Sequence, residues 1–297
     1  MKAIKENIWD RIFNIVNITL LTCFMLIVLY PLIYIVSASV SDPDLVSTGQ
    51  VWLLPKGITL EGYIRVLQDP DILTGYKNTI IYTVAGTTLN LFLTLTAGYA
   101  LSKKFLPGSR ALMFIFAFTM YFSGGMIPTY IMIKNLNLLN TYAILIISGA
   151  VNTYNLIIAK TFFANGVPKE LEEAAHIDGC SVIRTFFTII IPLSKALIGV
   201  LGLYYGISHW NSYFSALIYI NDRNKFPLQL VLREILIENQ QKAAMLIEDE
   251  ELALLQQKVA NLIKYSVIIV SSVPVLVIYP FLQKYFDKGV MLGSLKG

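Results

Sequence analysis

The chain has 297 residues, of which 56% are hydrophobic and 14% are charged, and its formal net charge is +4. Soluble domains carry roughly 25% charged residues, so this composition excludes an ordinary water-soluble protein and predicts an integral membrane protein. The mild positive charge does not indicate a nucleic-acid partner, and two cysteines, Cys23 and Cys180, are too few for a disulfide framework.

Six apolar stretches are each long enough to cross a bilayer, which takes about 20 helical residues. They are predicted at residues 12–40, 73–102, 111–133, 141–164, 193–220 and 262–284. The first stretch exceeds the roughly 7–15 apolar residues of a signal-peptide core, so it is interpreted as a retained span. The expected fold class is therefore an all-α integral membrane protein, with six transmembrane helices in a single domain that covers residues 1–297.

The basic residues of the connectors predict the orientation of these spans. The short connector between the second and third spans carries Lys103, Lys104 and Arg110, whereas the next short connector carries a single lysine. Lys and Arg are enriched in cytoplasmic loops. The sequence therefore predicts cytoplasmic N- and C-termini, a cytoplasmic segment at residues 165–192 and an extracytoplasmic segment at residues 221–261.

Within the cytoplasmic segment, residues 168–192 form a polar stretch between two apolar spans. Pro168 suits the first turn of a helix, and Gly179 suits the left-handed residue that ends one. The pattern predicts a helix–turn–helix elbow along the membrane surface. Small side chains at Ala174 and Ala175 would let a partner's groove approach the first helix closely. On composition alone, an ordinary amphipathic connector explains the stretch equally well.

Glycines, aromatic residues and amides mark further candidate positions in the fourth and fifth spans. The fifth span contains three glycines, Gly199, Gly202 and Gly206. The small-xxx-small spacing of Gly202 and Gly206 predicts close helix packing, and a substrate path is the alternative. The candidate substrate pathway comprises Trp210, Asn211, Tyr213, Asn152 and Asn155. Aromatic faces and amides suit a sugar, but an interfacial aromatic belt explains Trp210 and Tyr213, and helix packing explains the fourth-span asparagines.

The sequence predicts neither a catalytic nor a metal site. Its two histidines, His176 and His209, are too few for a His-based metal centre, and no Ser–His–Asp pattern supports a membrane enzyme. A G-x-x-x-x-G-K-[ST] phosphate loop is also missing, so any ATP that powers this protein must be bound elsewhere. The spans carry almost no acidic residues at mid-membrane depth, which argues against an ion-coupled carrier.

Several motifs resemble those of permease subunits in ATP-binding-cassette (ABC) importers. Their signature loop is matched by Glu173, Ala174, Ala175, Gly179, Ile189, Ile191 and Pro192. The usual pattern has leucine before the proline, so Ile191 is a conservative departure. Four further motifs resemble the carbohydrate branch of this family, and within it the uronate- or alginate-type oligosaccharide permeases. They are S-G-G-M-I-P-T-Y (123–130), N-L-N-L-L-N-T (135–141), H-W-N-S-Y-F (209–214) and the terminal G-S-L-K-G.

The resemblance implies a maltose-permease-like, type I importer fold in the bacterial plasma (inner) membrane. A second, homologous permease subunit would pair with this one, and two copies of an ABC ATPase would use ATP and Mg beneath them. The chain itself would bind no cofactor. An extracytoplasmic solute-binding protein would deliver the substrate through contacts at residues 221–251, for which a solvated lid is the alternative. The tail, residues 288–297, is either a frayed end or a second contact with the ATPase.

The elbow is then the part that inserts into a groove on the ATPase. The residues expected to make this coupling are Glu172, Glu173, Ala174, Ala175, His176, Asp178 and Gly179. The expected function is the pore-forming, non-enzymatic subunit of an ATP-driven importer for a sugar or oligosaccharide. The alternatives are an ABC permease for another polar solute and an ion-coupled secondary carrier.

Overall fold

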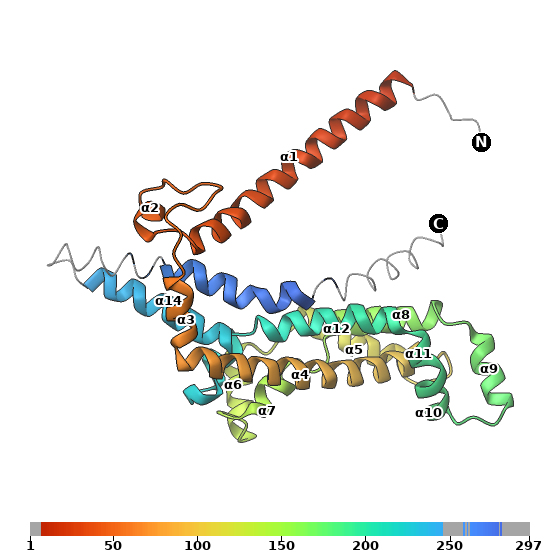
Figure 1. Ribbon diagram of the computed structural model, residues 1–297. Helices are drawn as coiled ribbons and strands as arrows, with labels where there is room; N and C mark the ends of the chain where they lie inside the picture. Colours follow the sequence, from red (N-terminus) through yellow and green to blue (C-terminus); the bar gives the residue numbers. More distant parts are fainter. Residues whose placement is uncertain (1–6, 246–257, 259, 261, 279, 281–297) are drawn as a thin grey trace. The chain divides into compact units, whose positions relative to one another are not determined.

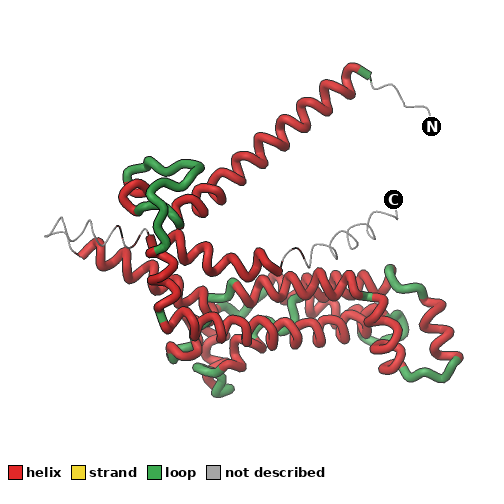
Figure 2. Tube along the Cα trace, viewed as in Figure 1, coloured by secondary structure: helices red, strands yellow, loops and turns green. Residues whose placement is uncertain are grey.

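The computed structural model describes residues 7–245, 258, 260, 262–278 and 280. Within these residues all regular secondary structure is helical (Figure 2), which confirms the all-α class. The chain divides into two compact units. The first comprises Met1–Asp69 and Arg233–Val273, and the second comprises Pro70–Leu232 and Pro274–Gly297.

The first unit contains the long N-terminal helix. Helix α1 (Ile8–Ser39) has 32 residues, about 48 Å of helix at 1.5 Å per residue. This length exceeds the hydrocarbon thickness of a bilayer, which is about 30 Å. The short helices α2 (Pro43–Ser47) and α3 (Glu61–Gln68) follow. The unit also takes in most of α14 (Leu228–Met245).

The second unit is organised around α4 (Pro70–Ser102), which packs most extensively against α8 (Thr153–Asn165) and α12 (Lys195–Trp210) (Figure 1). Close approach of α4 to α8 depends on Gly98. A Cβ built there would lie 2.7 Å from the Cβ of Ala159, a distance that real Cβ atoms do not show. The core of the unit includes Leu95, Tyr99, Ala159, Phe163, Phe186, Ile190, Leu197, Leu201 and Tyr205.

Three of the apolar stretches fold as broken helices. The third stretch forms α5 (Ser109–Tyr121) and α6 (Met126–Asn135), which meet at 116°. Gly125 lies at the bend with φ of +88°, a conformation that suits glycine. The fourth forms α7 (Tyr142–Ile147) and α8. The fifth forms α12 and α13 (Phe214–Tyr219).

By length and composition, two of the described helices, α1 and α4, could each cross a membrane. Counting each bent pair as one span raises the number to four; the pairs are α5–α6 and Val182–Leu193 with Lys195–Trp210. The six-span arrangement and the side of the termini therefore stay predictions. The described part of the sixth stretch is an apolar helix, Leu262–Ile278. The tail at residues 288–297 lies outside the described residues, as does most of the segment 246–261.

Candidate functional site

The fourth apolar stretch is interrupted at residues 148–152, between α7 and α8. Gly149 has φ of +72°, which L-residues avoid. The chain resumes its helix at Asn152, whose side-chain oxygen accepts a hydrogen bond from the backbone N–H of Asn155 at 3.1 Å. Carbonyl groups in such a break have no helical partner, and in a bilayer they must be satisfied by other parts of the protein.

Asn90 on α4 satisfies two of these carbonyls. Its Nδ2 donates to the backbone oxygens of Gly149 at 3.1 Å and Ala150 at 2.8 Å. Its Oδ1 lies 2.8 Å from Nε2 of His209 on α12. Because this amide oxygen only accepts, Nε2 of His209 must carry the proton. Asn90 is 1% exposed, and its amide forms a tether that joins His209 of α12 to the two carbonyls of the break.

Gly86 on α4 leaves room for the ring of His209. A Cβ built on Gly86 would lie 2.4 Å from both Cε1 and Nε2 of that ring. Any side chain here would therefore push the imidazole away from Asn90. Glycine at position 86 is required by this contact, one turn before Asn90 on the same helix.

Tyr205 of α12 provides a second tether to the break. Its hydroxyl accepts from the backbone N–H of Asn152 at 3.2 Å and lies 2.7 Å from Oγ1 of Thr94 on α4. Tyr205 is buried. The first residues of α8 are thus fixed by α12, while the carbonyls that precede them are fixed by α4.

A polar cavity of about 510 Å³ lies beside this break. Its lining consists of amides, hydroxyls, one imidazole and a few apolar groups, with no lysine, arginine, aspartate or glutamate among the described lining residues. The lining residues are Asn90, Leu145, Ser148, Gly149, Asn152, Tyr154, Asn155, Tyr204, Tyr205, Ser208, His209, Ser212 and Ser215. Its volume falls within the roughly 300–1,000 Å³ range of ligand pockets.

The cavity contains some of the expected pathway residues and omits others. Asn152 and Asn155 lie in its wall. Trp210 is 7% exposed and packs near Tyr76, with ring centroids 6.3 Å apart. Asn211 ends α12 on the surface, and Tyr213, 42% exposed, contacts Phe214. None of these last three lines the polar cavity.

Sequence reasoning missed a polar stripe on α12. Tyr204 and Ser208 are four residues apart in α12, which places them on one helix face. Ser212 follows just after the end of the helix, and all three residues border the cavity. Asn90 was a second available signal, because an amide within an apolar span is expensive unless it has partners. The apolar composition of both helices hid these positions.

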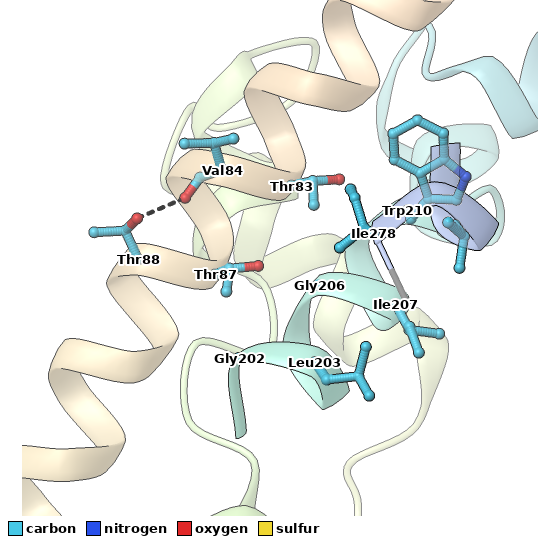
Figure 3. A pocket seen from close by; sticks show the side chains of 11 residues that line it. Thr83, Val84, Thr87, Thr88, Gly202, Leu203, Gly206, Ile207, Trp210 and Ile278 are labelled. Atoms are coloured by element: carbon cyan, nitrogen blue, oxygen red, sulfur yellow. Dashed lines mark hydrogen bonds between the residues drawn. The ribbon is translucent and has the colours of Figure 1, made fainter. Parts of the chain in front are cut away.

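Trp210 instead lines an apolar cavity of about 320 Å³ between α4, α12 and the last described helix (Figure 3). Gly202 and Gly206 form part of its wall, opposite Thr83 and Thr87. A Cβ on Gly202 would lie 3.7 Å from the nearest atom, and one on Gly206 would lie 3.9 Å away. These are ordinary contact distances, so within this chain the close approach of α4 and α12 does not depend on glycine at positions 202 and 206. The third glycine of the fifth stretch, Gly199, also lies in α12.

The polar stretch at 168–192 folds as a helix–turn–helix elbow. Helix α9 (Lys169–Ile177) ends in a Schellman motif, in which the N–H of Cys180 donates to the oxygen of Ala175 at 2.8 Å. Gly179 occupies the left-handed position with φ of +73°. The expected positive-φ end of the helix is confirmed.

The second arm of the elbow leads into α12 through a sharp turn. It consists of α10 (Val182–Thr185), a π-helical turn (Phe186–Ile190) and α11 (Ile191–Leu193). The segment Val182–Leu193 meets α12 at 82°. The bend between α11 and α12 comes just after Pro192, the proline that the sequence predicts at the join with the fifth span.

The seven candidate coupling residues divide between two faces of the elbow. Glu173, Ala174, His176, Asp178 and Gly179 are exposed. Glu172 is half-buried and forms an ion pair with Lys103, and Ala175 is 3% exposed. These two therefore face the rest of this chain rather than an external groove. Large apolar side chains also protrude from the elbow: Ile177, Val182 and Ile183 are 85%, 65% and 72% exposed.

Asn140 joins the loop after α6 to the start of the segment 221–261. Its side-chain oxygen accepts from the backbone N–H groups of Asn221 and Asp222 at 3.2 and 3.0 Å. Its backbone oxygen accepts from Nζ of Lys225 at 2.9 Å. The same ammonium lies 3.1 Å from Asp222 and lowers the pKa of that exposed carboxyl.

Curated proteins and a solved structure are similar to almost the entire chain, while no family model matches it. Protein LplC of Bacillus subtilis (strain 168) is 42% identical over 287 residues, which cover 97% of this chain and 96% of LplC. The polygalacturonan/rhamnogalacturonan transport system permease protein YtcP of the same organism is 39% identical over 288 residues, covering 97% and 99%. The crystal structure of a bacterial ABC transporter involved in the import of the acidic polysaccharide alginate matches with a TM-score of 0.85 and 37% identity, covering 96% of this chain and 100% of that one.

Proposed function

The chain belongs to the permease subunits of carbohydrate ABC importers, and from this premise we propose that the cavity beside the break at 148–152 is its part of the saccharide path. The protein is a component of a multi-subunit transporter in the bacterial inner membrane and has no ATPase site of its own. What is proposed here concerns the substrate, the pathway, the coupling contact and the partners.

The observation that carries the proposal is the chemistry of the cavity. Saccharides present hydroxyls that both donate and accept hydrogen bonds, and the amides and hydroxyls of Asn152, Asn155 and Ser208 offer both functions. Tyr154 and Tyr204 supply aromatic surface in the same wall. The described lining has no carboxylate, which is the group that usually marks the ion path of a coupled carrier.

The proposed substrate is an oligosaccharide that contains uronate residues. Support comes from the names of two relatives, one a permease for polygalacturonan and rhamnogalacturonan and the other a transporter for alginate. Alginate is named there as an acidic polysaccharide, and the galacturonan names denote chains that contain galacturonate. The uncharged cavity of this chain would contact the sugar hydroxyls, which every member of that substrate class shares.

The proposed coupling element is the exposed face of the elbow. Glu173, His176 and Asp178 present polar groups, and Ile177 and Val182 present apolar surface beside them. Contiguous exposed apolar groups rimmed by polar residues are typical of a contact surface. An ATPase subunit is the proposed occupant, in two copies per importer, and it would bind the ATP and Mg²⁺ used for transport.

The proposed topology has six spans with both termini in the cytoplasm, and the elbow then faces the ATPase. A second, homologous permease subunit would complete the pore. The solute-binding protein would dock on residues 221–251, of which 246–251 lie outside the described residues. In the first part of this segment, Asn221 and Asp222 donate backbone hydrogen bonds to the side chain of Asn140. Asn78 also holds it, because its Nδ2 donates to the backbone oxygen of Asn224 at 2.8 Å.

The test of this function uses the complete importer, purified through a tag on this chain and reconstituted with its binding protein. We expect ATP-dependent uptake of oligogalacturonate or alginate oligosaccharide, and none from an ion gradient alone. Uptake driven by an ion gradient without ATP would overturn the proposal in favour of a secondary carrier. ATP-dependent uptake of a different polar solute alone would overturn the substrate assignment.

A further inference from the structure

An ion pair joins the first arm of the elbow to the end of α4. Lys103 follows the last residue of α4, and its Nζ donates to both carboxylate oxygens of Glu172 on α9. The two side chains are only 15% and 25% exposed, so the pair is shielded from water on most sides. Nζ of Lys103 also lies 4.1 Å from the centre of the Tyr99 ring, in a cation–π contact.

Tyr99 connects the second arm of the elbow to the same turn of α4. Its ring lies 4.9 Å from that of Phe186 in the π-helical turn and 5.6 Å from that of Phe163 in α8. Tyr99 is 8% exposed. Both arms of the elbow therefore reach one site at the end of α4, one arm through Glu172 and the other through Phe186.

The same helix carries the tether of the cavity. α4 is continuous from Pro70 to Ser102, and Asn90 precedes Tyr99 by nine residues, about 14 Å along the axis. One unbroken helix thus connects the contacts of the elbow with the amide that holds the carbonyls of the break.

We propose that Lys103 and Glu172 are positioning residues that transmit movement of the elbow to α4. The ion pair, seated on Tyr99, keeps α9 and α4 moving as one body, so that a shift of the elbow alters the break at 148–152. This inference rests on the proposed function, in which an ATPase displaces the elbow. Removing one partner leaves a shielded charge without its counterion, which is unfavourable, and α9 is then free to shift relative to α4.

The pair has a sharply defined set of test variants. Lys103→Gln and Glu172→Gln each break the ion pair, Lys103→Arg keeps its charge and its ring contact, and Lys103→Glu/Glu172→Lys reverses it. Lys104→Glu is the matched control, since Lys104 is the neighbouring residue and is exposed. The readout is the amount of oligosaccharide taken up per ATP hydrolysed by the reconstituted importer, together with the amount of ATPase that co-purifies with the chain.

We expect Lys103→Gln and Glu172→Gln to lower uptake per ATP about tenfold, a typical size for a lost coupling, with the ATPase still bound. Lys103→Arg and Lys104→Glu retain the wild-type ratio. The reversed pair recovers most of the loss, because the ion pair is restored while the cation–π contact is not. Unchanged uptake per ATP in both glutamine variants, or a reversed pair as poor as the single variants, would overturn the inference.

A cross-link keeps the inference falsifiable if the single variants fail to assemble. Lys103→Cys/Glu172→Cys is combined with Cys23→Ser and Cys180→Ser, and the pair is bridged with a reducible bis-methanethiosulfonate. We expect the bridged importer to take up more oligosaccharide per ATP than the same importer after reduction, because the bridge replaces the lost ion pair and keeps the two helices together. Equal uptake per ATP before and after reduction would also overturn the inference. Loss of uptake that reduction restores would show that the elbow must move away from α4, and the inference would be wrong.

Glu173→Lys separates this inference from the function on which it rests. Glu173 is exposed on the elbow and is expected to contact the ATPase, so its reversal should release the ATPase. If Glu173→Lys leaves both ATPase binding and uptake intact, the docking of the elbow is wrong. If it releases the ATPase while Lys103→Gln keeps the normal uptake per ATP, the docking stands and only the transmission role of the pair is refuted.

Discussion

His209 and Asn90 are 119 residues apart in the sequence, and Nε2 of the first lies 2.8 Å from Oδ1 of the second. This contact orients the amide of Asn90 so that both of its N–H groups point at the carbonyls of Gly149 and Ala150. The geometry of the polar cavity therefore depends on one residue from α4, Asn90, and one from α12, His209. Disturbing either residue should change the cavity without touching its remaining walls.

Asn90→Asp tests the tether to the carbonyls. The carboxylate has the shape of the amide but cannot donate, so the two part-buried carbonyls of Gly149 and Ala150 lose their partner. Each orphaned group costs about 1–3 kcal/mol, and we expect lower thermal stability of the importer and loss of most uptake. Thr88→Ala is the control, because the Thr88 hydroxyl bonds only to its own helix, at 2.7 Å to Val84. Wild-type uptake and stability in Asn90→Asp would refute the tether.

His209→Gln and His209→Asn test which ring nitrogen matters. The glutamine amide extends to about the position of Nε2 and can still donate to Asn90, whereas the asparagine amide is one carbon shorter and ends near Nδ1. We expect the glutamine variant to keep substantially more uptake than the asparagine variant. Initial rates at several oligosaccharide concentrations measure this. The reverse order would mean that the contact with Asn90 does not orient the cavity.

Gly86→Ala and Gly202→Ala form a matched pair on facing helices. A methyl group at position 86 would collide with the His209 ring at 2.4 Å, whereas one at position 202 meets its nearest atom at 3.7 Å. Overpacking costs about 1–3 kcal/mol, and alanine is favoured over glycine in a helix by about 1 kcal/mol. Thermal unfolding should therefore show loss of stability in Gly86→Ala and none in Gly202→Ala. Equal effects would contradict the assigned packing.

Asn140→Ala and Asn137→Ala separate hydrogen bonding from backbone strain. Both asparagines have positive φ, +58° and +54°, so alanine is strained at either site. Only the Asn140 side chain accepts from the backbone of the segment at 221–222. We expect Asn140→Ala to destabilise the importer by about 1–2 kcal/mol more than Asn137→Ala, measured by thermal unfolding. Two equal losses would leave strain as the sole effect.

The elbow was predictable because its signals are local. Gly179 after a short polar helix predicts a left-handed helix end whatever surrounds it, and a proline near the join predicts a bend. What the sequence could not supply is the direction in which α9 turns. Glu172 turns toward Lys103, and Ala175 is buried; no spacing within the elbow carries that information.

The cavity was not predictable from the apolar pattern, which was interpreted as continuous helices. The break at 148–152 contains one glycine, Gly149, and two polar residues, Ser148 and Asn152, between apolar segments. Its geometry depends on side chains from α4 and α12 that are 53 and more residues away. The spacing of Gly202 and Gly206 carries no information about the facing helix, where Gly86 of α4 makes the tight contact with His209 of α12.

The central claim, that the saccharide passes through the polar cavity, is tested most directly by modifying one of its walls. In importer lacking Cys23 and Cys180, Ser208→Cys places a thiol in the polar cavity and Thr88→Cys places one in the apolar cavity. We predict that a methanethiosulfonate reagent stops uptake only in the Ser208→Cys importer, and that oligogalacturonate slows this inactivation. Full uptake after complete modification of Ser208→Cys would contradict the account.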